Sequence, residues 1–390
     1  CWRQMRDFFY APNMHGLNWV KIKEKYQPLV KYVNNRADLT YIIGEMIGEI
    51  SVGHAYVGGG DYPKPEKINI GLLGAKLVQD SQSKYYKITK ILKGQNWNPS
   101  LRSPLTEIGV NINEGEYIIA IDGKQVNSVN NIFELLTGKA DKQVTLTINS
   151  SPQEKGSRDV VVVPISNEQQ LYYYNWVQTN IEKVNKASNG EVGYIHIPDM
   201  GPAGLNQFTK LFYPQTKKKA LIIDDRGNGG GNVSPMITER LLRQPVMLDI
   251  SRNGSINYNP GGMHVGPKVL LLNEFSASDG DIFPYRFKFY KMGKTVGKRS
   301  WGGVVGIRGT LPIVDGGYLN RPEFSRFDLD GKWNIEGHGV DPDIFVDNDP
   351  ATEFGGTDQQ LDRAIEEIMK ELKNNPPKEY KVPEYPDKSK

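Results

Sequence analysis

The chain has 390 residues, enough for two or three domains with separate hydrophobic cores. Its 38% hydrophobic and 24% charged residues are typical of a globular protein, and the net charge of +3 comes from dispersed basic side chains. Nucleic-acid binding needs clustered basic residues, and no apolar run is long enough to cross a bilayer, so neither a nucleic acid nor a membrane is an expected partner. The one cysteine, Cys1, excludes an internal disulfide framework.

The first 65 residues predict a helical domain. They begin "CWRQMRDFFYAP", without a signal-peptide core or a starting methionine, so we expect a fragment or processed form. We expect a cytoplasmic location, with the periplasm as the alternative. Apolar residues recur at helical spacing through residues 17–50, with breaks near Pro28 and Asn34. The glycines and prolines of "SVGHAYVGGGDYPKP" then end regular structure.

Residues 66–163 predict a small β-rich module. Short runs rich in β-branched and aromatic residues follow one another: "YYKITKIL", "YIIAIDG", "QVTLTI" and "DVVVVPI". One segment, "VNNIFELLT", has helical character. A long amphipathic helix is predicted over residues 165–189, where the module ends.

The remaining chain alternates strand and helix patterns. Continuous apolar runs at residues 220–223 and 269–272 indicate strands buried on both faces. Strands that alternate with helices predict an α/β fold with a mostly parallel sheet covered by helices. A final helix is predicted to begin at Thr357, where "TDQQ" fits a capping box. The Pro- and Lys-rich tail after it is predicted to be extended.

Two strand ends carry polar and glycine-rich turns. "DRGNGGGN" follows "ALIID", and "EFSASDGD" follows "VLLLN". Ligands of open α/β sheets bind beyond the carboxyl ends of the strands. Unpaired amides at a helix N-terminus suit an anion or oxyanion, although a tight strand-to-helix turn explains the glycines equally well. The turn lacks the Gly-Lys-Ser/Thr ending of a phosphate-binding loop.

Ser276 and Ser278 each have two interpretations. A serine before a helix is most often an N-cap, whereas a nucleophilic serine needs a base and a group that orients the base. No GxSxG sequence occurs, which excludes a standard α/β-hydrolase.

The residues alone leave the base open among three histidines, His54, His264 and His338. His15 precedes a helix, and His196 lies within a buried strand pattern that favours a core role. No His, Cys, Asp or Glu cluster has metal-ligand spacing, so neither a metal nor another cofactor is expected.

Several long motifs resemble one known family. They are "GHAYVGGGDYP", "GQNWNPSLRSPLTEIGVNINEGEYIIAIDG", "DDRGNGGGNVS", "NEFSASDGDIFPYRF", "GKRSWGGVVGI" and "GVDPDIFVDNDP". In this order they resemble the C-terminal half of tricorn proteases, which are related to the C-terminal processing peptidases. The resemblance implies a helical domain (1–65), a PDZ-like domain (66–163) and an α/β serine peptidase domain with crotonase/ClpP-like layers and an extended tail (164–390).

The resemblance also implies roles for individual residues. Ser278 matches the nucleophile, His54 the general base and Glu336 the carboxylate of the charge network. The oxyanion hole would consist of the Asp279 amide with the amide of Gly230 or Gly231.

Two further sites follow from the same resemblance. Asp249 matches an acidic residue that favours basic side chains at the P1 position of the substrate. The start of the PDZ-like domain resembles a loop that binds peptide carboxylates through backbone amides, formed here by Gly71, Leu72, Leu73 and Gly74.

The sequence departs from the family pattern at two positions. The processing peptidases have a lysine base where this chain has Gly303, so the base must be a histidine, and Lys298 in the same motif is expected to be structural. Tricorn enzymes commonly have a serine before the histidine, which links it to the glutamate. This chain has Gly53 there, so a water or a direct contact must replace the hydroxyl.

These observations together predict a serine endopeptidase or oligopeptidase that hydrolyses peptides or unfolded proteins through an acyl-enzyme, and that can assemble as a homo-oligomer. The alternatives are a non-catalytic protein that binds a peptide or another ligand on the same scaffold, and a PDZ scaffold whose second domain is structural.

Overall fold

The computed structural model describes residues 1–389. The chain forms two compact units, one made of residues 1–63 together with the chain from residue 183 onward, the other of residues 64–182.

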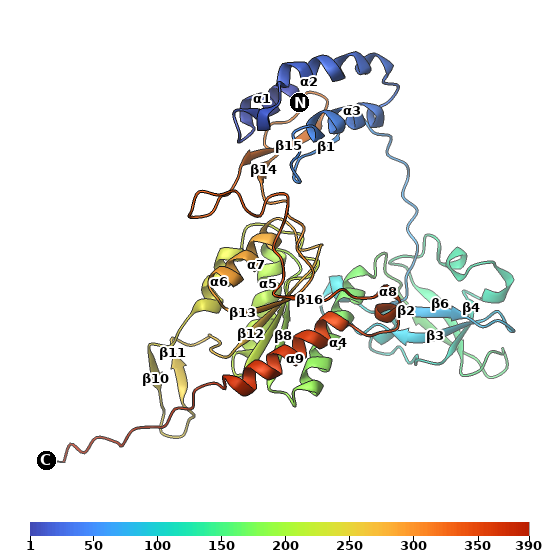
Figure 1. The fold of residues 1–390 in the computed structure, drawn as a ribbon. Helices are drawn as coiled ribbons and strands as arrows, with labels where there is room; N and C mark the ends of the chain where they lie inside the picture. The colour runs from blue at the N-terminus through green and yellow to red at the C-terminus, as the bar shows by residue number, and fades with distance from the viewer. Residues whose placement is uncertain (390) are drawn as a thin grey trace. The chain divides into compact units, whose positions relative to one another are not determined.

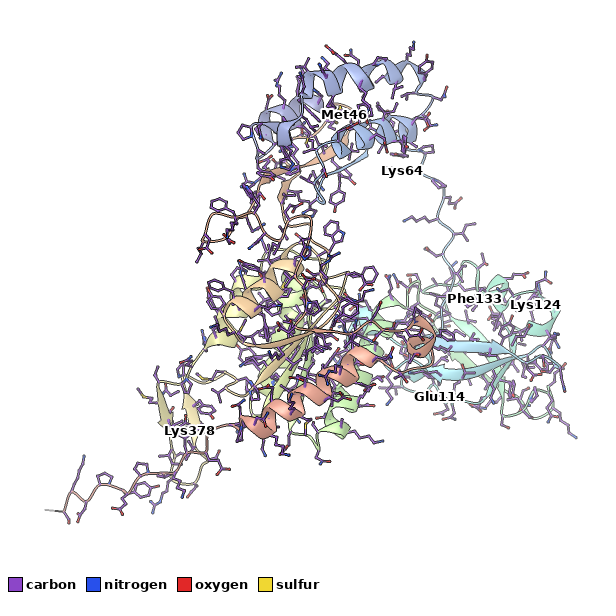
Figure 2. All side chains as sticks on the ribbon, viewed as in Figure 1. Met46, Lys64, Glu114, Lys124, Phe133 and Lys378 are labelled. Atoms are coloured by element: carbon purple, nitrogen blue, oxygen red, sulfur yellow. The ribbon has the colours of Figure 1, made fainter. Side chains whose placement is uncertain are left out.

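The N-terminal residues of the first unit form three short helices: α1 (Trp2–Phe8), α2 (Trp19–Tyr26) and α3 (Arg36–Gly48). Asparagine side chains cap two of them, since Asn18 accepts the Lys21 amide and Asn35 accepts the Asp38 amide. A 3-10 turn that contains Pro28 separates α2 from α3, where a break is predicted. Met46, labelled in Figure 2, is buried in the small core between these helices.

A long-range β-sheet joins this helical region to a late part of the chain. Strand β1 (Tyr56–Gly59) pairs antiparallel with β15 (Gly317–Phe324), which also pairs with β14 (Gly306–Arg308). Figure 1 shows β1, β14 and β15 beside the N-terminal helices. The pairing places residues just before β1 next to the segment that leads into β14.

The centre of the first unit is a parallel sheet in the strand order β16-β13-β12-β9-β8. Every residue of β8, β9 and β12 is buried, as their apolar patterns predict. The strand bounds are β8 Val192–His196, β9 Ala220–Asp224, β12 Lys268–Leu272, β13 Gly293–Gly297 and β16 Ile344–Phe345.

Helices cover this sheet, which confirms the predicted α/β class. Helix α9 packs along β9, β12 and β13, and α6 packs against α7 (Figure 1). The helices of the first unit after β8 are α5 Pro202–Phe212, α6 Ser234–Leu242, α7 Asp279–Phe289, α8 Pro350–Phe354 and α9 Gln359–Asn374. Helix α4 (Gln169–Ala187) lies mostly in the second unit.

The start of α9 differs from the prediction. Its N-cap is Asp358 rather than Thr357, and the Asp358 carboxylate accepts the Leu361 amide at 3.0 Å. The same carboxylate also accepts a hydrogen bond from the Arg226 guanidinium at 2.8 Å. An aspartate that caps a helix and pairs with a buried arginine satisfies more donors than a threonine hydroxyl can.

The second unit is an antiparallel sheet in the strand order β2-β3-β4-β6-β7, with the short β5 paired to β4. The predicted helical segment is a single 3-10 turn (Ile132–Leu136) with an Asn131 capping box. The strands are β2 Ala75–Gln79, β3 Tyr86–Ile91, β4 Tyr117–Ile121, β5 Lys124–Gln125, β6 Val144–Asn149 and β7 Arg158–Val162.

The sequence predicted neither the short strands β1, β14, β15 and β16 of the first unit nor a hairpin before β12. The chain between α6 and β12 forms a hairpin of two short strands, β10 (Met247–Asp249) and β11 (Asn257–Asn259). Within residues 1–389, no helix has the length and apolar character needed to span a membrane.

Candidate active site

Ser278 occupies a strained turn between β12 and α7. Its backbone angles, φ 58° and ψ −115°, lie in a region that residues other than glycine rarely occupy. Such a conformation costs about 1–3 kcal/mol and is concentrated at functional sites. Ser278 stands at the N-cap position, but no side-chain cap bond is formed there, and no other hydrogen bond to its hydroxyl is found within residues 1–389. The N-cap interpretation therefore does not explain this serine.

Ser276 has the structural role instead. It is fully buried, and its hydroxyl donates to the Asp225 carbonyl at 2.8 Å and accepts the Asn273 amide at 3.2 Å. These two bonds join the ends of β9 and β12. They set the turn from which Ser278 projects.

The glycine-rich turn after β9 lies directly against Ser278. A Cβ atom added to Gly230 would lie 2.6 Å from the Ser278 Cβ and 3.1 Å from the Asp279 nitrogen. Gly230 also has a φ of 86°, so glycine is required there for both space and conformation. This close approach brings backbone amides to the Ser278 side chain.

The backbone amides of Asp279 and Gly231 have no acceptor among the described residues. The Gly230 amide, in contrast, donates to the Asn228 side chain at 2.9 Å. The Asp279 carboxylate is bound by the start of α6, since it accepts the Ser234 amide and hydroxyl at 2.9 and 2.6 Å. The turn thus leaves free donors beside Ser278, which is what an oxyanion requires.

The imidazole of His54 is held by a backbone carbonyl. Its Nδ1 lies 2.9 Å from the Val305 oxygen. Because a carbonyl can only accept, Nδ1 carries the proton, and the neutral ring presents an unprotonated Nε2 that can act as a base. Tyr56 and Trp301 meet the ring edge-to-face at centroid distances of 5.4 and 5.8 Å.

The Glu336 carboxylate binds backbone rather than imidazole. Its Oε2 accepts the amides of Val304 and Val305 at 2.6 and 2.9 Å, and its Oε1 accepts the Gly53 amide at 3.2 Å. Glu336 therefore ties the residue before His54 to the segment whose carbonyl orients His54. Within residues 1–389, no hydrogen bond joins His54 to Glu336 or to Ser278, and catalytic hydrogen bonds are often long before substrate binds.

The two departures from the family pattern lie side by side. A Cβ atom on Gly53 would lie 3.8 Å from the Glu336 Oε1 and 3.2 Å from the Gly303 Cα. A Cβ atom on Gly303 would meet the Trp301 ring at 2.2 Å, so the indole fills the space that a lysine would need. Lys298 forms ion pairs with Glu274 and Asp347, consistent with the expected structural role.

The other four histidines have partners elsewhere. His196 and His264 are buried, and burial lowers the pKa of both, that of His264 to about 3. His338 pairs with Asp341 at the surface, and His15 contacts Tyr10. His54 is the histidine whose ring packs on Trp301, and the Trp301 amide donates to the Ser276 carbonyl at 3.0 Å.

Asp249 is not brought to Ser278. It is exposed at the end of β10, where its carboxylate accepts the Asn259 side chain at 3.0 Å. Tyr258 of the same hairpin lines a cavity of about 540 Å³ with Lys268, the first residue of β12, and with Lys378. Ser278, in contrast, lies in the turn after Leu272, the last residue of β12, at the opposite end of the sheet. Figure 2 shows Lys378 beside this hairpin. A role for Asp249 in the P1 pocket of its own chain is not supported by this position.

The four residues of the PDZ-like loop are largely engaged within their own unit. The Gly71 amide donates to the Leu136 carbonyl, the Leu72 amide to the Ile165 carbonyl, and the Gly74 amide to the Glu168 carboxylate. Leu73 is buried. Carboxylate binding by this loop remains a prediction, with the Leu73 amide as its one donor that has no acceptor among the described residues.

Sequence reasoning missed two buried carboxyl groups near Ser278, those of Asp225 and Asp281. Burial raises the pKa of Asp281 to about 6, and burial followed by the charge of Asp224 raises the pKa of Asp225 well above its usual range. The motif "SASDGD" contains the signal for Asp281, a second acidic residue in the first turn of α7. No group of three metal-binding side chains occurs in the described part of the chain.

Family models match three parts of the chain. Residues 1–48 match the tricorn protease C1 domain, residues 71–167 the tricorn protease PDZ domain, and residues 191–346 peptidase family S41. The C1 and S41 segments lie in the first unit and the PDZ segment lies in the second. The S41 segment contains Ser278.

Relatives match almost the whole chain. A tricorn protease homolog of Saccharolobus solfataricus is 40% identical over 95% of this chain and 34% of its own length. The tricorn protease of Thermoplasma acidophilum is 35% identical, over 96% of this chain and 34% of its own length. A putative tricorn-like protease C-terminal subunit of Sulfurisphaera tokodaii is 38% identical, over 95% of this chain and 43% of its own length.

A solved structure gives the same result. The crystal structure of the tricorn protease superposes with a TM-score of 0.89 at 35% identity, over 96% of this chain and 36% of that chain. The chain therefore spans about a third of the length of the tricorn proteases that it matches.

Proposed function

Because the chain belongs to the tricorn protease family, we propose that it is a serine peptidase that cleaves peptides through an acyl-enzyme on Ser278. The observation that carries this proposal is the backbone of Ser278. A strained strand-to-helix turn with a hydroxyl that has no partner within residues 1–389 exposes a nucleophile at the end of a parallel sheet. Stability alone gives no reason for that conformation.

The proposed first step is attack on the peptide carbonyl. His54 Nε2 takes the proton from the Ser278 hydroxyl as its oxygen bonds to the carbonyl carbon. The developing oxyanion is held by backbone amides, for which Asp279 and Gly231 have the donors without acceptors in the described chain. The positive end of α7 adds to this stabilisation.

The second step releases the product. His54 returns its proton to the leaving amine, and a water molecule deprotonated by the same ring hydrolyses the acyl-enzyme. Glu336 contributes as a positioning residue, since its carboxylate contacts the backbone on both sides of His54 rather than the reacting atoms.

The substrate class and setting belong to the same proposal. We propose peptides or unfolded proteins as substrates, a homo-oligomeric assembly, and a cytoplasmic location. A single cysteine is in keeping with a reducing compartment. The relatives' full length, of which this chain covers about a third, can supply further determinants of substrate choice.

A fluorophosphonate probe tests the function directly, because it reacts with activated serines. We expect one site of labelling, at Ser278, and none in the Ser278→Ala variant. A peptide library read by mass spectrometry should then show cleavage by the wild type only. An unlabelled wild-type protein that still binds peptides would instead indicate a non-catalytic binding protein.

A further inference from the structure

Asp281 is a buried carboxylate three residues after Ser278, in the first turn of α7. It has no exposed surface. Its Oδ1 accepts the Gly302 amide at 2.7 Å, while its Oδ2 has no hydrogen-bond partner within residues 1–389. A buried charge that is incompletely paired is costly. Stability therefore does not explain why a carboxylate stands here.

The Asp281 side chain faces two backbone segments. An acidic residue at the third position of a helix usually bonds back to the N-cap amide. Here burial raises the pKa of Asp281 to about 6, and the Ser300 hydroxyl and the amides of Gly302 and Ser278 oppose that rise. The carboxylate thus lies between the nucleophile's own backbone and the start of the segment from Ser300 to Val305, which we call the 300–305 segment.

The 300–305 segment holds the rest of the catalytic groups in place. The Val305 carbonyl receives the His54 Nδ1–H, and the amides of Val304 and Val305 donate to Glu336. A second tie joins the segment to the nucleophile turn, because the Trp301 amide donates to a carbonyl two residues before Ser278. A shift of this segment relative to α7 would move the base relative to the nucleophile.

We propose that Asp281 is a positioning residue that fixes the 300–305 segment, and through it His54, at its working position relative to Ser278. The inference rests on the proposed peptidase function. The carboxylate is suited to this task because an ionised acceptor makes shorter and stronger hydrogen bonds to amides than a neutral one. A misplacement of about 1 Å between reacting groups can lower a rate by roughly a hundredfold.

The test compares Asp281→Asn with a matched control, Asp343→Asn. Asp343 also ties a backbone amide, that of Thr295 at 2.9 Å, but in the middle of β13 and away from the 300–305 segment. We expect fluorophosphonate labelling of Ser278 and kcat for a peptide ester to fall about 10- to 100-fold in Asp281→Asn, with KM within about threefold. Asp343→Asn should keep both rates within about twofold of wild type.

Hydrogen exchange supplies a readout that does not depend on activity. Amides of the 300–305 segment should exchange at least about tenfold faster in Asp281→Asn than in wild type. In Asp343→Asn their exchange rates should equal those of wild type. The double variant Asp281→Asn/Glu336→Gln should lose less activity than the product of the single losses, since both side chains act through this segment. If Asp281→Asn does not fold, Ser300→Ala, which removes the hydroxyl beside the carboxylate, is measured in its place and should show a smaller loss of the same kind.

The outcomes separate the two proposals. A wild-type protein that is not labelled at Ser278 overturns the peptidase function and this inference with it. Wild-type labelling with an equal rate in Asp281→Asn overturns the inference alone. Equal losses in Asp281→Asn and Asp343→Asn, or unchanged exchange of the 300–305 segment, also overturn it.

Discussion

The Glu336 carboxylate accepts the backbone N–H of Gly53, the residue before the proposed base, at 3.2 Å. The glutamate therefore acts on His54 through two stretches of backbone, one on each side of the imidazole. Residue 53 is the point where a side chain could convert this indirect contact into a direct one.

Gly53→Ser should raise kcat by about threefold to thirtyfold with little change in KM. The added Cβ would lie 3.8 Å from Glu336 Oε1, within reach of a hydroxyl hydrogen bond, and Gly53 does not have a left-handed backbone that would strain a serine. A bound water in that place would cost up to about 2 kcal/mol to order, which the hydroxyl avoids.

Gly53→Ala is the matched control for this gain. It adds the same Cβ, at 3.2 Å from the Gly303 Cα, but no hydroxyl. Steady-state kinetics on a peptide substrate should show the gain for serine only. A folded Gly53→Ser protein with unchanged or lower kcat would mean that the hydroxyl has no part in orienting His54.

Ser278→Ala should lower peptidase kcat at least about a thousandfold, because the acyl-enzyme cannot form. The hydroxyl makes no hydrogen bond within the described residues, so its removal should leave the melting temperature within a few degrees of wild type. Peptide turnover within about tenfold of wild type would rule Ser278 out as the nucleophile.

Glu336→Gln should slow turnover less than His54→Ala does. The carboxylate accepts three backbone amides, and a glutamine places an NH₂ group against at least one of them. The base would stay in place but be held less firmly, whereas His54→Ala removes it. Kinetics of the two variants on one substrate check the order. Full activity of Glu336→Gln would remove Glu336 from the site.

Gly230→Ala should abolish fluorophosphonate labelling, because its Cβ would lie 2.6 Å from that of Ser278. The control is Gly227→Ala. Gly227 also has a positive φ, 71°, but a Cβ there meets no atom of the described residues within 4 Å. Both variants should lose roughly 1 kcal/mol of stability from backbone strain, and Gly230→Ala should lose more because of its steric clash. Only Gly230→Ala should lose labelling. Equal labelling of the two would contradict the close contact.

The pH dependence of stability should change in Asp281→Asn. Burial raises the folded-state pKa of Asp281 from its ordinary value of 3.8 to about 6, so folding favours the neutral carboxyl group. The stability that the neutral Asp281 carboxyl group contributes is fully present below the pKa of the unfolded chain. It is lost as the pH rises through 6. The carboxyl groups of Asp225 and Glu336 face Asp281 and remain in both proteins.

Denaturant unfolding at pH 4 and pH 8 measures this effect. The free energy of unfolding of wild type minus that of Asp281→Asn should fall by about 2 kcal/mol from pH 4 to pH 8. A difference that is independent of pH would show that Asp281 keeps an ordinary pKa in the folded protein.

Local sequence patterns determined the main strands and helices and the residue types of the turn that carries Ser278. Apolar runs such as those of β9 and β12 depend only on burial on both faces of a sheet, so the sequence predicted them together with their helices. The turn that carries Ser278 was also predictable from local sequence, because its strand, polar turn and helix are adjacent in the chain. Its function stayed open, since an N-cap serine has the same local pattern.

The tertiary structure decided what depends on contacts between distant segments. The pairing of β1 with β15 brings His54 to Val305, and no local pattern states which of two distant strands will pair. The family resemblance named Glu336, but that its carboxylate binds the Gly53 amide rather than the imidazole follows only from the folded backbone. Asp249 lies at the amino end of the sheet because its hairpin folds there, a position that the sequence around it does not reveal. Residue chemistry and periodicity are local, whereas a catalytic site depends on distances across the fold.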